Sequence, residues 1–340
     1  MRTAASSRAN RLVSLRDLVA LGVSLGITDR RRLSDLAIER GVFLTERDRR
    51  HYSYSSVYRY LDSLRSLQFE VAESIGEPMV WSRAALALAE AAQNTQFTSE
   101  LSENEREIFR EQVFVSKAAN QFLSCFCPPG NTPHSRDELL RDGRPLYVLG
   151  TVKTPQVCSG GSRKDTDGRT VRIALDPDTG KSEEKPQQEF LYTYRLWCLD
   201  SELIEELNIA EAVRNGIPRS QSFVLFPVRA GMAPSEAQFV DAIYATVGSR
   251  PRPYSVAVPR LMYKLCVDLR ITVETFKGLL LRVWASNRDL FHLERGPAVL
   301  IKGDFSVEPV SYGERYRNQR YYIVLDHTVR THLVVFPRGR

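Results

Sequence analysis

The chain has 340 residues, which is more than one compact core usually holds, so two or three domains are expected. Hydrophobic residues make up 43% and charged residues 26%, no apolar run could span a bilayer, and residues 1–11 lead into no signal-type apolar segment. We therefore expect a cytoplasmic protein with no membrane association. The net charge of +6, carried more by arginine than by lysine, favours an acidic partner such as nucleic acid, although a GC-rich genome also enriches arginine.

Cysteine and histidine give no sign of a metal site or a disulfide framework. The five cysteines are irregularly spaced, and Cys125-Phe126-Cys127 has no second ligand pair nearby. None of the five histidines pairs with another at helical spacing. We expect reduced, buried thiols and no cofactor.

The first 98 residues predict three helices followed by two strands. Leucine and valine recur at helical spacing from Leu12 to Val23, a turn follows at residues 26–29, and a second helix runs over 31–40 and ends at Gly41. A third helix spans 52–67. Strands at 69–74 and 79–81 flank a turn at Gly76-Glu77-Pro78. This order resembles a winged helix, which lays its third helix on DNA.

The third helix has a buried stripe of Val57, Leu61 and Leu64 and an opposite face that is mostly short and polar. Short side chains allow close approach to a groove, and flanking arginines suit phosphate contacts. The predicted DNA-binding residues here are Arg30, Arg31, Arg32, Arg47, Arg49, Arg50, Tyr52, Tyr54, Ser55, Ser56, Arg59 and Ser63. Against this, Asp62 shares the polar face and the wing contains Glu70, Glu73 and Glu77, so an assembly role is an alternative to DNA reading.

A helical connector is expected at residues 99–127. Ser102-Glu103-Asn104-Glu105 has the form of a capping box and begins a helix to about Lys117, and an apolar segment follows over 118–126. A proline- and glycine-marked linker occupies 127–143. An alanine-rich helix at 82–93 belongs to the preceding domain.

Residues 144–249 predict a small mixed α+β domain. Strands are expected at 145–152, 170–175 and 189–197, the last two joined as a hairpin through 176–186. A helix at 201–214, a strand at 222–228 and a helix at 235–247 follow.

After Arg250-Pro251-Arg252-Pro253, residues 254–340 predict a second winged-helix-like domain with a β tail. Helices at 259–269 and 272–285 precede strands at 290–294 and 298–301, and further strands are expected at 321–325 and 332–336. The candidate reading face carries Thr275, Lys277 and Arg282. Arginines interleaved with tyrosines in the tail suit a nucleic-acid contact, and the predicted contacts are Arg315, Arg317 and Arg320. A half-buried sheet edged with charge explains the tail equally well.

The stretch Leu269-Arg270-Ile271-Thr272-Val273-Glu274-Thr275-Phe276, followed by a hairpin, is similar to segments in accessory proteins of prokaryotic antiviral and restriction-like systems. That resemblance implies work inside a multi-subunit machine that handles DNA, and it implies no catalytic residues.

The signs of chemistry are few. Gly180-Lys181-Ser182 lacks the earlier glycine of a phosphate loop because Leu175 stands there. Asp178, Glu183 and Lys185 are similar to the metal site of restriction-type nucleases, but they fall within one predicted turn.

We therefore expect an α+β fold with a winged helix at each end of a helical connector and a mixed middle domain. The leading hypothesis is a non-catalytic DNA-binding accessory subunit whose partners are double-stranded DNA and other protein subunits. A protein–protein adaptor and a metal-dependent nuclease are the alternatives.

Overall fold

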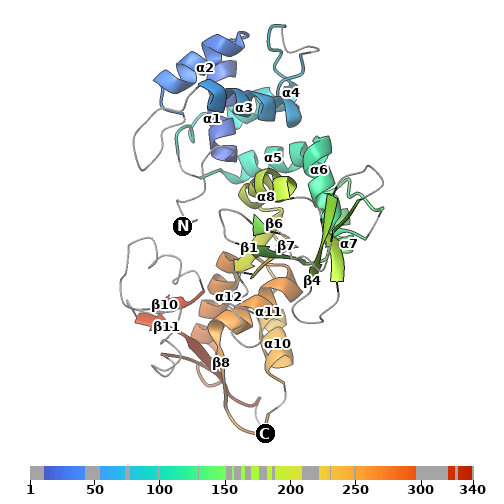
Figure 1. The fold of residues 1–340 in the computed structure, drawn as a ribbon. Coiled ribbons are helices and arrows are strands. Elements are labelled where there is room, and N and C mark those ends of the chain that lie inside the picture. Colours follow the sequence, from blue (N-terminus) through green and yellow to red (C-terminus); the bar gives the residue numbers. More distant parts are fainter. Residues whose placement is uncertain are drawn as a thin grey trace.

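The structure is a computed structural model that places most of the chain. It describes residues 11–42, 54–72, 77–98, 100–128, 130–150, 155–156, 162–164, 170–175, 182–185, 188–208, 222–229, 231–248, 250–295, 321–325 and 328–338. The α+β class is confirmed, because the chain combines helices with small antiparallel sheets (Figure 1). Within these residues, no helix is both long enough and apolar enough to cross a membrane.

As far as the structure describes it, the N-terminal unit contains four helices, all of them expected. They are α1 (Leu12–Ser24), α2 (Arg30–Glu39), α3 (Tyr54–Ser66) and α4 (Arg83–Ala91). The predicted turn before α2 is confirmed: Gly26 takes a positive φ of 59°, and the Asp29 side chain caps α2 by accepting from the Arg32 N–H at 2.6 Å.

The two expected wing strands are reduced to a minimal hairpin. Glu70 and Trp81 form an isolated antiparallel bridge, and the Val71 N–H donates to Val80 O at 3.0 Å. The Met79 N–H donates to Thr28 O at 2.7 Å, which joins the hairpin to the turn between α1 and α2. Residues 73–76 lie outside the described residues.

The connector is helical as expected. Its elements are α5 (Glu103–Val115), α6 (Lys117–Leu123), the short helix η1 (Ser124–Phe126) and α7 (Arg136–Asp142). The predicted capping box is confirmed, because the Ser102 side chain accepts from the Glu105 N–H and the Glu105 carboxylate accepts from the Ser102 N–H.

Two of the middle-domain predictions are wrong. Residues 189–197, expected to be a strand, belong to α8 (Gln188–Asp200), and residues 201–214, expected to be a helix, contain β6 (Ile204–Asn208). Residues 189–197 were misassigned because a short apolar run does not distinguish a buried helix from a strand. The strand β6 was missed because the charged pair Glu205-Glu206 is not typical of a strand that is buried on both faces. The strands β1 (Leu146–Gly150), β2 (Pro155–Gln156) and β7 (Ser222–Pro227) complete a sheet of order β2-β1-β7-β6.

A hairpin does start at β4 (Thr170–Leu175), but its partner differs from the expected one. β4 pairs with β5 (Ser182–Lys185) and with β3 (Ser162–Lys164). The segment expected to pair with it is α8 instead.

In the described part of the chain, the C-terminal unit has three helices, and a strand separates the first two. Its elements are α10 (Glu236–Val247), β8 (Tyr254–Ala257), α11 (Val258–Leu269), α12 (Val273–Ser286), β9 (Phe291–Glu294), β10 (Ile323–Leu325), β11 (Thr328–Arg330) and β12 (His332–Val335). The sheet order is β8-β12-β9, so the first strand of the unit pairs with its last. The expected strand at 298–301 lies outside the described residues.

The helix α10 shares a core with the C-terminal unit. Phe239 and Ile243 lie in one hydrophobic cluster with residues of α11 and α12, and the Phe239 and Phe276 rings meet edge to face at 5.6 Å. A boundary between residues 249 and 254 therefore falls inside this cluster.

The sheet of β1, β6 and β7 lies between two hydrophobic cores. Ile204 and Leu225 belong to the core formed with the N-terminal and connector helices, whereas Leu207 and Val224 belong to the core formed with α10, α11 and α12. The period of two along each strand sends alternate side chains into the two cores. Figure 1 shows the resulting order: the N-terminal unit at one end, then the connector helices, the sheet and the C-terminal unit.

Residues 200–206, which we call the hub segment, contact every layer of this arrangement. Asp200 accepts from the Leu12 N–H at 3.1 Å and from Arg11 at 2.7 Å, at the N-terminus of α1. Ser201 O accepts from Arg110 of α5 at 2.7 Å. Glu205 accepts from the Val273 N–H at 3.1 Å, at the N-terminus of α12. Carboxylates at helix N-termini are favourable positions because unpaired N–H groups point at them.

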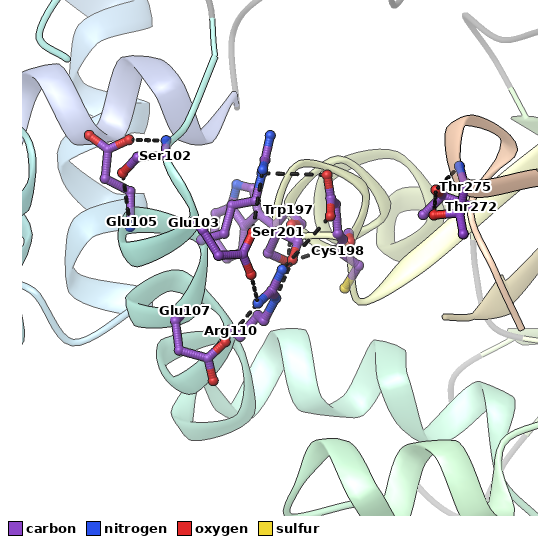
Figure 2. A network of polar contacts seen from close by, with 12 residues as sticks. Ser102, Glu103, Glu105, Glu107, Arg110, Trp197, Cys198, Ser201, Thr272 and Thr275 are labelled. Atoms are coloured by element: carbon purple, nitrogen blue, oxygen red, sulfur yellow. Dashed lines mark hydrogen bonds and ion pairs between the residues drawn. The ribbon is translucent and has the colours of Figure 1, made fainter. Parts of the chain in front are cut away.

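Figure 2 shows how Arg110 joins α5 to the hub segment. Its side chain is 3% exposed and also donates to Glu103 at 2.7 Å and Glu107 at 2.6 Å. Burial alone would raise the pKa of the Glu103 carboxyl, but the hydrogen bond and charge of Arg110 bring that pKa below its ordinary value.

Candidate nucleic-acid interface

Arg30 is engaged within the N-terminal unit and does not point to solvent. Its guanidinium donates to both oxygens of Glu70, at 3.2 and 2.5 Å, and its side chain is 11% exposed. Glu70 is buried, and such a carboxylate requires a paired cation. Arg30, expected to contact phosphate, therefore holds α2 to the wing.

Ser63 differs from the expected position on the open face of α3. It is 8% exposed, in a helix whose buried residues include Tyr60, Leu61 and Leu64. The neighbouring Asp62 is exposed, so a carboxylate and not a hydroxyl faces solvent there.

The other predicted residues of the N-terminal unit are placed only in part. Arg31 and Arg32 are exposed on α2, as a phosphate contact requires. Tyr54, Ser55, Ser56 and Arg59 belong to α3, but their side chains lie outside the description, as do Arg47, Arg49, Arg50 and Tyr52 entirely.

In the C-terminal unit, the predicted reading face of α12 is partly open. Arg282 is 57% exposed and its Nε lies 3.2 Å from the Glu236 carboxylate, while Lys277 is half-buried. Arg315, Arg317 and Arg320 lie outside the described residues.

The N-terminal end of α12 is closed by the middle domain. Glu205 accepts from Val273 there, and the Thr272 side chain caps the helix by accepting from the Thr275 N–H at 3.1 Å. Arg270, in the turn before α12, donates to Leu140 O and, at 2.9 Å, to Gly143 O at the end of α7. These contacts bind the N-terminal end of α12 on the side of the middle domain.

Three exposed arginines of the C-terminal unit each lie over an aromatic ring. The Arg250 guanidinium carbon is 3.9 Å from the Tyr254 ring centroid, Arg288 is 3.9 Å from Trp284, and Arg338 is 4.4 Å from Tyr244. A planar guanidinium stacks on a ring and gains cation–π attraction. Stacking holds the group flat, while the Arg338 guanidinium is also bound to the Asp241 carboxylate and the Arg250 Nε donates to Val247 O.

The sheet register brings these three pairs to one end of the C-terminal sheet. Val335 in the central strand pairs with Tyr254 on one side and Phe291 on the other. Arg250 lies four residues before Tyr254, Arg288 three before Phe291 and Arg338 three after Val335. Because β8 and β9 both run antiparallel to β12, all three arginines leave the sheet at the same end.

We name this feature the stacked-arginine end; it comprises Arg250, Arg252, Arg288 and Arg338 with Tyr244, Tyr254 and Trp284. The end is held together by the Tyr244 hydroxyl, which donates to Phe336 O at 2.8 Å, and by Phe336 N–H, which donates to Leu290 O at 2.9 Å. Its acids are Asp241, 2.5 Å from Arg338, and Asp289. Positive charge is therefore in excess.

The arrangement can bind an anion, and the described residues give no sign of metal chemistry. Among them, no group of three or more His, Cys, Asp or Glu side chains could hold a metal ion. Of the nuclease alternative, Glu183 and Lys185 lie in β5, and Asp178 is outside the described residues.

Comparison with known proteins identifies no relative. No family model, curated protein or solved structure matches the chain.

Sequence reasoning treated Arg250-Pro251-Arg252-Pro253 as a domain boundary and did not single out Arg288. The available signal was the repeated proximity of arginine and aromatic residues: Arg250 with Tyr254, and Trp284 with Arg288, each four apart. The third pair, Tyr244 with Arg338, is 94 residues apart and had no local signal.

Proposed function

We propose that this protein is a non-catalytic DNA-binding accessory subunit whose C-terminal unit supplies most of the DNA affinity. The observation that carries the proposal is the distribution of charge. Residues 236–340, which begin with α10, contain 16 Lys and Arg and 10 Asp and Glu, whereas residues 99–235 contain 17 and 20. The C-terminal unit thus has a formal charge of +6 beside a middle of −3. Such a concentration of positive charge favours a polyanion.

The topology supports a winged-helix assignment for both ends. Each unit has a helix, a strand or single extended residue, and two more helices. Two extended segments follow in the N-terminal unit, whereas the strands β9 to β12 follow in the C-terminal unit, and in both units the first extended segment pairs with the last. In the N-terminal unit the first extended position is Thr28, which accepts from Met79. The winged helix is a fold that many DNA-binding proteins use, and the proposal extends that use to this chain.

The test is a titration of the full chain against a fluorescently labelled duplex at low and moderate salt, with and without Mg²⁺. We expect binding that weakens steeply with salt, because affinity from arginine–phosphate contacts depends on counterion release. The duplex should remain intact in Mg²⁺. Absence of binding at low salt would contradict the proposal, and Mg²⁺-dependent cleavage would favour the nuclease alternative.

One observation favours an adaptor function for the N-terminal unit. Val71 and Val80 pair across the wing and are 49% and 53% exposed. An exposed apolar pair suits contact with protein more than with phosphate. In this second candidate function, Val71→Asp with Val80→Asp abolishes subunit association, measured by light scattering or with a purified partner, and leaves DNA affinity unchanged.

A further inference from the structure

We propose that the stacked-arginine end grips the phosphate backbone of duplex DNA without reading bases, and that the N-terminal end of α12 does not enter a groove. This inference rests on the proposed DNA-binding function and specifies the surface and the part of the DNA that it contacts.

Two guanidiniums of this end, those of Arg250 and Arg288, have N–H groups that can donate to phosphate oxygens. Nε of Arg250 donates to Val247 O at 3.2 Å, and no described residue accepts from its two terminal nitrogens. Arg288 has its ring contact with Trp284 and, among the described residues, no carboxylate bound to its guanidinium. A guanidinium fixed in one plane loses little freedom when it binds two phosphate oxygens side by side.

The spacing suits a DNA strand. Arg250, Arg338 and Arg288 extend from three adjacent strands, and neighbouring strands lie about 4.8 Å apart, so the outer two are separated by roughly 10 Å. Successive nucleotides of one DNA strand rise roughly 3.4 Å along the axis. The three segments therefore match about three base steps of a single backbone.

The same geometry disfavours recognition of bases. Proteins that bind single strands stack bases on open aromatic rings, but one face of Tyr244, of Tyr254 and of Trp284 is already covered by arginine. Base readout in the major groove normally uses the N-terminal part of a recognition helix. In α12 that part is bound by Glu205 and flanked by Arg270, which is anchored on α7.

The experiment compares two double variants that remove the same charge from opposite ends of the full chain. Arg250→Gln with Arg288→Gln removes two stacked arginines. Arg40→Gln with Arg83→Gln removes two exposed arginines of the N-terminal unit that are not among the predicted DNA contacts, and is the matched control. Each is titrated against two duplexes of unrelated sequence and one single strand over a range of salt.

We expect the first variant to bind both duplexes at least tenfold more weakly. The slope of log affinity against log salt should become shallower by about 2, since each phosphate contact contributes about 0.9. The loss should be equal for the two sequences, and the control should keep the wild-type slope. Lysine at both positions, Arg250→Lys with Arg288→Lys, should restore most of the slope and serves as the second variant if glutamine disturbs folding.

The outcomes separate the inference from the function on which it rests. Binding by the wild type that neither the glutamine nor the lysine variant alters would overturn the inference and leave the function standing. Equal losses in the first variant and the control, a loss confined to one sequence, or tighter binding of the single strand would also overturn it. Absence of wild-type binding would contradict the proposed function itself.

Discussion

At the residue scale, whether an arginine is exposed to a partner or bound within the protein depends on which residues lie beside it in space. Arg30, Arg31 and Arg32 are consecutive, yet Arg30 binds the buried Glu70 while its two neighbours are exposed. Helical geometry turns successive side chains by about 100°, so a basic cluster is necessarily divided between faces. Only some members of such a cluster remain available to a partner.

This division leads to a stability prediction. Arg30→Ala leaves the Glu70 carboxylate buried without its partner, and we expect the free energy of unfolding to fall by about 3–5 kcal/mol. Arg31→Ala or Arg32→Ala should change it by less than about 0.5 kcal/mol. Urea unfolding followed by circular dichroism measures both. Similar losses in the free energy of unfolding for the three substitutions would mean that the ion pair between Arg30 and Glu70 adds no stability of its own.

His332 predicts a pH dependence of stability. It is buried at the start of β12, its ring nitrogen lies 2.9 Å from the Thr331 hydroxyl, and burial lowers the pKa of its imidazole below 6.5 despite the opposing charge of Glu294. The unfolded chain therefore takes up the proton first. The contribution of His332 is present above pH 6.5 and is lost as pH falls through 6.5 towards the folded-state pKa.

The measurement is thermal unfolding between pH 7.5 and 5.5. The wild type should lose stability over that range, and His332→Asn should lose less of it. A variant with the wild-type pH profile would show that other groups govern the dependence.

At the element scale, two helical glycines have opposite surroundings. A Cβ on Gly22 of α1 would lie 2.2 Å from the Trp81 ring, which is fixed by its N–H donating to Ile27 O at 3.0 Å. A Cβ on Gly278 of α12 would meet only the Arg282 guanidinium, at an ordinary 3.6 Å. The missing side chain of Gly22 thus permits close packing of α1 against the hairpin. No such close packing depends on the missing side chain of Gly278.

Alanine at these two positions should act with opposite sign. Gly22→Ala should destabilise by about 1–3 kcal/mol through overpacking. Gly278→Ala should stabilise by about 0.5–1 kcal/mol, because alanine has less backbone freedom to lose in a helix. Denaturant midpoints of the two variants decide this. Stabilisation by Gly22→Ala would contradict the close packing of Trp81.

At the scale of the whole molecule, the hub segment and the central sheet make one body of two cores. β6 and β7 contribute side chains to both clusters, and Glu205 and Arg270 fasten α12 and its preceding turn to the middle. The two positively charged ends of the molecule are therefore joined through continuously packed elements. DNA bound at the C-terminal unit would be fixed relative to the N-terminal unit.

This coupling predicts cooperative unfolding. The three tryptophans, Trp81, Trp197 and Trp284, lie in the N-terminal unit, the middle and the C-terminal unit respectively. In variants that retain only Trp81 or only Trp284, the remaining tryptophan should report the same urea midpoint of unfolding. Adding Glu205→Ala and Arg270→Ala, each worth about 1–3 kcal/mol, should lower the Trp284 midpoint more than that of Trp81. Coincident midpoints in this background would show that the sheet alone couples the cores.

The sequence by itself determined the helices of both ends, the capping box at Ser102, and the α+β class. These follow from local periodicity and from side chains that bond to backbone groups three residues away. It did not determine α8 and β6, because a short segment buried on both faces has no periodic pattern and Glu205 and Glu206 find their partners, Val273 and Arg195, only in the folded chain. Tertiary structure alone decided that Arg30 is engaged by Glu70, that the N-terminal end of α12 is closed, and that arginines from three segments meet at one end of a sheet. Each of these depends on contacts between residues far apart in the chain, where strand register and burial, and not local pattern, set the neighbours.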